Sequence, residues 1–197
     1  SLFPPSGEPR ENTDLPPIRP LFQGRILRIG CATLAAAAGP MGVSVLVAVA
    51  ARDNFNVSGS KAGLILLAGA VSSFLLGPTW GRVLDRFGYR QSSIAAAIFL
   101  TGFVSLISTA NNALTLGILW FLAGGMVGFM SVVLQALGAT QIPDNRGGTL
   151  SFILSFRFLG VGLGPIIWIP VIEQSFKGAI LGASALGLVT VYLLSKN

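Results

Sequence analysis

Histidine is absent from this 197-residue chain, and cysteine and charged residues are scarce. Without histidine there can be no Ser–His–Asp triad, no HExxH zinc site and no haem held by histidine. The single cysteine, Cys31, cannot form an intrachain disulfide or a cysteine cluster for a metal. We therefore expect no metal and no cofactor, and the chain is not expected to be an enzyme. An intramembrane protease of the serine–histidine type is excluded on the same ground.

Charged residues make up only 10% of the chain, whereas hydrophobic residues make up 52% and the mean hydropathy is +0.76. Because a soluble domain carries about 25% charged residues, this composition predicts an integral membrane protein. The formal net charge is +6, but the basic residues lie in short segments between apolar runs and form no single patch. This distribution favours contact with membrane lipid and predicts no nucleic-acid partner.

Six apolar runs are long enough to cross the hydrocarbon core, which takes roughly 20 helical residues. The predicted fold is an all-α integral membrane protein with six transmembrane helices, and the short connections make consecutive helices antiparallel neighbours. Residues 1–26, which begin with a segment rich in proline and charge, are predicted to be a cytoplasmic linker or tail. The predicted spans are 27–50, 62–80, 93–110, 113–137, 149–172 and 176–195.

The basic residues also predict how the chain is oriented in the membrane. If the first residues are cytoplasmic, nine Lys and Arg residues fall inside and three fall outside, with Arg157 left within a span. This bias predicts a multi-pass protein of the cell inner (plasma) membrane with both termini in the cytoplasm. The inside set is Arg10, Arg19, Arg25, Arg28, Arg82, Arg86, Arg90, Arg146 and Lys196, and the outside set is Arg52, Lys61 and Lys177.

A charged segment bounded by glycines, Gly81–Arg90, lies between the second and third runs and has the pattern G-x-x-x-D-R-x-G-x-R. It resembles the signature loop of major facilitator superfamily (MFS) transporters, which implies a cytoplasmic connection over 81–92. The resemblance makes Asp85 a gating acid that meets a helix N-terminus and an arginine on the closed cytoplasmic side. The other signature residues are Gly81, Arg86, Gly88 and Arg90. Arg86 and Arg90 could pair with Asp85 or with lipid phosphates. The alternative is a basic turn that merely obeys the positive-inside rule.

Arg157 is a second candidate functional residue because it lies about eight residues, or roughly 12 Å, into the fifth span. A charge at this depth is costly unless it faces a cavity or a partner. It is therefore a candidate cavity or substrate contact. The alternative is that its long side chain reaches back to the cytoplasmic interface.

The fifth span continues with glycines and a proline, and Gly160, Gly164 and Pro165 form a Gly-x-x-x-Gly-Pro motif. The motif resembles part of the glycine–proline motif of drug:proton antiporters, although Trp168 and Ile169 stand where that motif ends in two further glycines. Glycines permit close helix packing and a proline bends a helix. We favour helix packing and bending as the role of these three residues.

The resemblance also indicates which part of a transporter the chain corresponds to. Complete MFS members have twelve helices in two similar halves. Trp120 stands where the first half usually carries an arginine tied to proton coupling, and residues 1–28 resemble the loop that joins the halves. The six spans are therefore interpreted as the seventh to twelfth helices, the C-terminal half of a bacterial drug-efflux-type member.

The implied function is secondary active transport of small molecules by alternating access, with efflux of amphipathic compounds as the favoured direction. The expected partners are the substrate, membrane lipid, and either the missing N-terminal half or a second copy. No acid lies deep within a span, so proton-coupled antiport would need an acid from the absent half, and uniport stays open. The alternative function is a non-transporting membrane scaffold or an inert transporter fragment.

Overall fold

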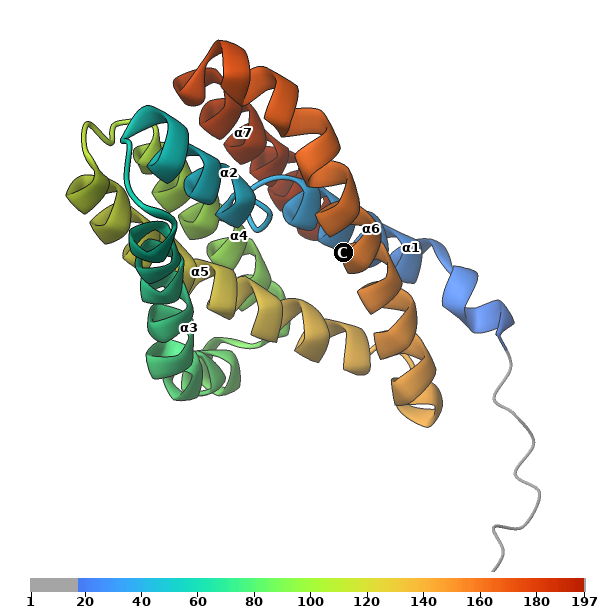
Figure 1. Cartoon of the computed structure of the whole chain (residues 1–197). Coiled ribbons are helices and arrows are strands. Elements are labelled where there is room, and N and C mark those ends of the chain that lie inside the picture. The colour runs from blue at the N-terminus through green and yellow to red at the C-terminus, as the bar shows by residue number, and fades with distance from the viewer. Residues whose placement is uncertain (1–17, 197) are drawn as a thin grey trace, which may run out of the picture.

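The structure is a computed structural model that describes residues 18–196, and in this range every regular element is a helix. Most of the predicted tail of residues 1–26 lies outside the described residues, and the first long helix begins three residues before the predicted span (Figure 1). The elements are η1 (Arg19–Phe22), α1 (Gly24–Ala38), α2 (Ser44–Val49), η2 (Ala50–Asn54), α3 (Gly59–Phe87), α4 (Tyr89–Ile107), α5 (Ala113–Ala139), η3 (Pro143–Asn145), α6 (Arg146–Gln174) and α7 (Phe176–Ser195).

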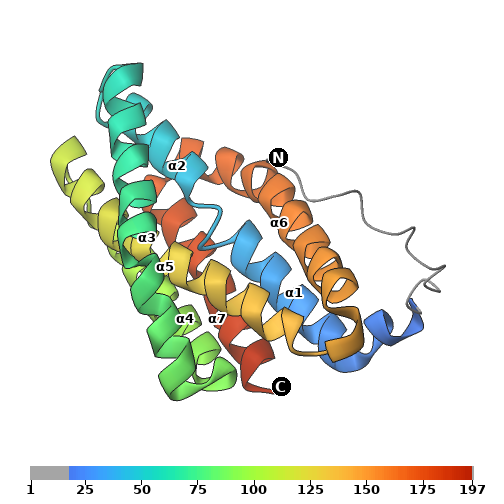
Figure 2. The same ribbon diagram turned by 90° about the horizontal axis from the view of Figure 1, so that it is seen from below.

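Among the described residues, five helices, α3 to α7, are long and apolar enough to cross a membrane. The predicted span 27–50 is divided among α1, α2 and η2, because the chain unwinds between α1 and α2. Gly39 ends α1 at φ −106° and ψ −112°, and Pro40 has no N–H to continue the helical hydrogen bonds. Figure 2 shows α1 and α2 following each other along the bundle, joined by this unwound segment.

The predicted connection over 81–92 was wrong in length, because it is much shorter in the structure. Helix α3 continues to Phe87 and α4 begins at Tyr89, so Gly88 alone separates them. Gly88 has φ +77° and ψ 162°, a conformation that glycine adopts with little strain. Gly81, Asp85 and Arg86 therefore belong to the last two turns of α3.

Two groups of helices build the bundle. Helix α5 packs against α3 and α4, and α1 packs against α6 and α7, while α4 and α7 join the groups. The crossing of α3 and α5 depends on glycines, because a Cβ atom on Gly124 would lie 2.4 Å from the Cα of Gly69. Trp120 fills the next part of this crossing and its Nε1 donates to the carbonyl of Leu66 at 3.3 Å.

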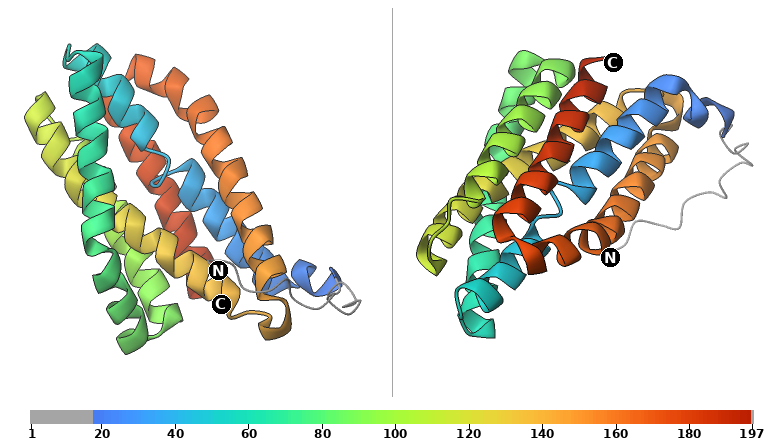
Figure 3. Two further views of the ribbon diagram at one scale, coloured as in Figure 1. Left: turned by 60° about the horizontal axis from the view of Figure 1, so that its bottom comes forward. Right: turned by 90° about the horizontal axis from the view of Figure 1, so that it is seen from above.

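Helices α3 and α6 are much less covered than the others. Only 17% of the apolar window of each is buried, against 39% to 44% for α4, α5 and α7. Their exposed faces carry large side chains such as Phe74, Phe158 and Ile166, which are 71% to 81% exposed. Figure 3 shows α3 and α6 as outer helices on either side of α1 and α2. These apolar faces need lipid or another protein surface to cover them.

Candidate functional site

One end of the bundle gathers the turn between α3 and α4, the start of α1 and the end of α7 (Figure 2). Two arginines cap α7 there. Arg90 Nη2 donates to the carbonyl oxygen of Ser195 at 2.9 Å, and Arg28 Nη1 donates to the carbonyl oxygen of Lys196. Cations at a helix C-terminus satisfy free carbonyls and oppose the negative end of the helix dipole. The sequence did not reveal this link, because these residues are more than 100 positions apart.

Asp85 has a different environment from the one that the signature implies. It lies in the last turn of α3, its side chain is exposed, and it accepts no hydrogen bond from the residues that the structure describes. The Arg86 guanidinium carbon lies 5.5 Å from the centre of the Phe87 ring, and Arg90 is engaged with α7. The structure therefore brings neither arginine to Asp85 by hydrogen bonding.

Gly81 does not mark a close approach within this chain. A Cβ atom at Gly81 would meet no atom within 4 Å. If this glycine permits close packing, the neighbour is a surface outside residues 18–196.

Arg157 lies on α6 and is half-buried. In contrast to Arg28 and Arg90, its guanidinium has no hydrogen-bond partner among residues 18–196. The preceding residue, Phe156, packs against α1, and a Cβ atom on Gly30 would lie 3.0 Å from its ring. Arg157 thus follows directly on a residue of the α1–α6 contact, and its donors are unpaired within residues 18–196.

The glycines of α6 face the C-terminal end of α1. A Cβ atom on Gly160 would lie 2.6 Å from the carbonyl oxygen of Leu34, and one on Gly164 would lie 3.2 Å from that of Ala38. Helix α6 continues through Pro165 and Pro170 as far as Gln174. The close approach of two backbones at these glycines is the geometry that the packing interpretation requires.

Trp168 is a residue whose role the sequence did not indicate, since it stood out only as a departure from a glycine motif. Its Nε1 donates to the carbonyl oxygen of Ala38, the last residue of α1, at 2.7 Å. A Cβ atom on Gly182 of α7 would lie 2.5 Å from the Trp168 ring. One side chain thus connects α6 and α7 to the end of α1 where the chain unwinds.

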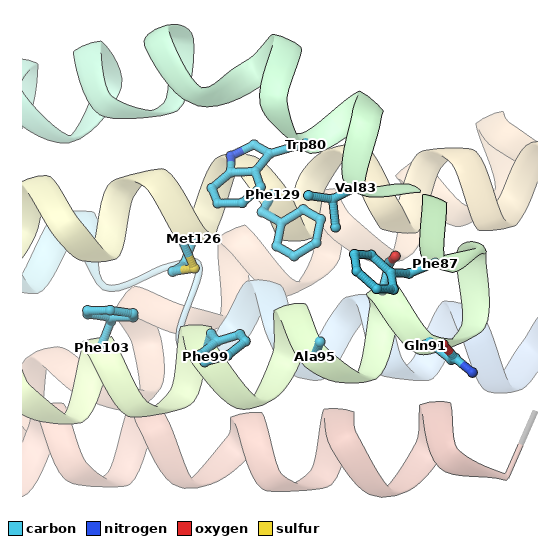
Figure 4. Close-up of a pocket in the computed structure, with 10 residues that line it drawn as sticks. Trp80, Val83, Phe87, Gln91, Ala95, Phe99, Phe103, Met126 and Phe129 are labelled. Carbon is cyan, nitrogen blue, oxygen red and sulfur yellow. The ribbon is translucent and has the colours of Figure 1, made fainter. Parts of the chain in front are cut away.

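A cavity of about 550 Å³ lies between α3, α4 and α5, close to the α3–α4 turn (Figure 4). Its walls are mostly apolar and aromatic, and Trp80 stacks on Phe129 with ring centres 4.4 Å apart. The indole N–H of Trp80 donates to the carbonyl oxygen of Gly125 at 3.1 Å, which fixes this wall. Other lining residues are Phe87, Phe99, Phe103 and Met126.

The composition, the five long apolar helices and the exposed apolar faces together define a multi-pass membrane protein of the all-α class. The family is shown by comparison with known sequences. A sequence profile of the Major Facilitator Superfamily matches residues 29–196. The chain belongs to this superfamily, as the Gly81–Arg90 pattern indicated.

Curated relatives agree with this assignment. The chain is 30% identical over 163 residues to "Probable transport protein HsrA" of Haemophilus influenzae, a match that covers 78% of this chain and 34% of that protein. It is 30% identical over 133 residues to "Multi-drug resistance efflux pump PmrA" of Streptococcus pneumoniae, covering 68% of this chain and 31% of the relative. It is 31% identical over 106 residues to "Uncharacterized MFS-type transporter YuxJ" of Bacillus subtilis, covering 53% and 27%. The matches span about a third or less of each relative.

Proposed function

We propose that this chain forms one six-helix half of a secondary active transporter that exports small molecules by alternating access. The observation that carries the proposal is the superfamily match over residues 29–196, in a chain that matches only about a third of its relatives' length. In this proposal α1, α2 and η2 together make the first of the six crossings, which is interrupted at residues 39–43. Interrupted helices are common at the binding sites of secondary transporters.

The second half of the transport path would pack against the uncovered faces of α3 and α6. Both helices are long, apolar and only 17% buried, and two such outer faces on one bundle supply a surface for a second six-helix unit. That unit is either an N-terminal half or a second copy of this chain. The arrangement would give Gly81, which has open space beside it, a neighbour to approach. It would also give Arg157, half-buried and without a hydrogen-bond partner among the described residues, a cavity to face.

Amphipathic compounds are the proposed cargo. This rests on the name of one relative, a multidrug resistance efflux pump, and on the apolar side chains that the helices expose. Acids are missing from the interior of the described helices, since Asp53, Asp85, Asp144 and Glu173 all lie at or near helix ends. A proton-coupled antiport would therefore take its membrane-buried acid from the other half.

The orientation in the inner membrane is the first point to test. We expect both termini and the α3–α4 turn to be cytoplasmic, because the basic residues concentrate at that end. Single cysteines at Asn54 and Phe87, which are both exposed, can be placed in a Cys31→Ser background and labelled with an impermeant maleimide in intact cells. Position 54 should be labelled from outside and position 87 only after the membrane is opened. The reverse pattern would contradict the orientation.

Transport itself is tested by comparing residues 1–197 alone with the same chain joined to, or coexpressed with, a first half. We expect the complete carrier to give saturable efflux of ethidium from liposomes and the chain alone to insert without flux above protein-free vesicles. The physical reason is that the path lies between two halves. Saturable flux from the chain alone would show that it is a complete transporter. Lack of flux from the complete carrier, tested also with rhodamine 6G, would favour a scaffold.

A further inference from the structure

The aromatic cavity between α3, α4 and α5 has the depth of one membrane leaflet. Its lining on α4 extends from Gln91 to Phe103, which is about 18 Å at 1.5 Å per residue. One leaflet of the hydrocarbon core is about 15 Å deep. The cavity therefore begins at the polar end of the helices and reaches roughly to the bilayer midplane, alongside Phe99, which is 55% exposed (Figure 4).

A single buried hydroxyl interrupts the apolar lining. Ser92 is only 2% exposed and lines the cavity near its polar end, and its Oγ has no hydrogen-bond partner among the described residues. A buried polar atom without a partner is unfavourable. The Oγ has almost no accessible surface of its own, so Ser92 marks the level at which the lining becomes polar and is not itself a contact of an occupant.

Basic side chains lie near the polar end of the same cavity, beside one exposed acid, Asp85. Phe87 lines the cavity, and the Arg86 guanidinium lies over its ring at 5.5 Å. Arg82 and Arg90 are exposed within four residues of Arg86, and Arg90 also donates to the carbonyl oxygen of Ser195. Arginine guanidinium groups match the oxygens of phosphate in geometry and charge. The polar end of the cavity therefore favours an anionic group, and its apolar interior accepts an alkyl chain.

We propose that this cavity binds an anionic phospholipid, with one acyl chain between α3 and α4 and the phosphate against Arg86 and its neighbours. Glycerol or ester oxygens lie at the level of Ser92. The site requires only that the helices lie in a bilayer, so it does not depend on transport. Lipid binding here differs from the general attraction of anionic lipid to the basic chain, because this site combines a position for the headgroup with a defined cavity for one acyl chain.

Trp80 provides a reporter inside the cavity. The full chain is placed in nanodiscs of phosphatidylcholine that contain a fixed fraction of phosphatidylglycerol, with bromine on the acyl chains of one lipid at a time. We expect brominated phosphatidylglycerol to quench the Trp80 emission, taken as the difference between wild type and Trp80→Phe, more strongly than the same fraction of brominated phosphatidylcholine. Trp120 and Trp168 supply the background in both proteins.

Substitutions separate selection of the lipid headgroup at this site from the general attraction of anionic lipid to a basic protein. Arg86→Gln should lower the preference for phosphatidylglycerol about fivefold, because a basic residue near the membrane surface contributes about 1 kcal/mol. Arg86→Lys should keep most of the preference. Lys61→Gln is the matched control, since Lys61 is exposed at the opposite end of α3, and it should leave the preference unchanged.

Two results would overturn the proposal. Equal quenching by the two brominated lipids would show that the cavity meets ordinary surrounding lipid without selection. Absence of Trp80 quenching by either lipid would show that protein covers the cavity. Unchanged emission from Trp120 and Trp168, measured after Trp80→Phe is added to each variant, confirms that the fold is kept, so a loss of preference can be assigned to the site.

Discussion

Gly124→Ala should destabilise the bundle by about 1–3 kcal/mol, although alanine is the better helix former. The new Cβ atom would lie 2.4 Å from the Cα and 2.5 Å from the carbonyl oxygen of Gly69. These are backbone atoms that cannot rotate away, so α3 and α5 must separate, and overpacking of this kind costs about 1–3 kcal/mol. Trp120 packs in the same crossing and would lose contact with α3.

Gly117→Ala is the matched control on the same helix. Its Cβ atom would meet only Ile65, at 3.8 Å, which is ordinary van der Waals contact. The gain in helix propensity of up to about 1 kcal/mol should then appear without a penalty. Thermal unfolding of both variants in detergent, followed by size-exclusion chromatography, measures the difference. If both variants unfold at the same temperature, the glycine crossing of α3 and α5 does not hold the bundle together.

The long helices could be predicted because the membrane sets their length. Apolar runs of about 20 residues predict α3 to α7 in the right order, although the connection between α3 and α4 is far shorter than predicted. The break in the first run was missed, since its alanines and valines are apolar on either side of Gly39 and Pro40. Gly39 and Pro40 are local signals for a helix break, but the length of the apolar run alone predicts a continuous span.

The charged end of α3 was misjudged for a related reason. The charges after Gly81 predict a loop, yet a helix need not end where the hydrocarbon ends, because arginine side chains reach water from a helix surface. Gly88 was the informative residue, since its positive φ ends α3. Contacts such as Arg90 with Ser195 and Trp168 with Ala38 depend on tertiary packing, and local sequence carries no signal for them.

Asp85→Asn should reduce transport by the complete carrier about tenfold while leaving the stability of this half unchanged or slightly higher. Asp85 lies in the last turn of α3 and is exposed, and a carboxylate at a helix C-terminus is disfavoured by about 0.3–1 kcal/mol. Removing the charge of Asp85 should therefore not lower the stability of this half. If the acid meets a helix N-terminus of the other half when the carrier is closed, its loss removes roughly 1.4 kcal/mol from that state alone.

Asp144→Asn is the control that makes this result interpretable. Asp144 is also exposed, and it lies in η3, just before the N-terminus of α6, where a carboxylate is favourable. The same change of charge should lower stability slightly and leave transport intact. Ethidium efflux at matched expression and thermal unfolding of each variant are measured together. Efflux at the wild-type rate by the Asp85→Asn variant would contradict the gating role of Asp85. A loss of stability with Asp85→Asn would show instead that the acid serves the fold of this half, because a gate contact with another half cannot stabilise the chain on its own.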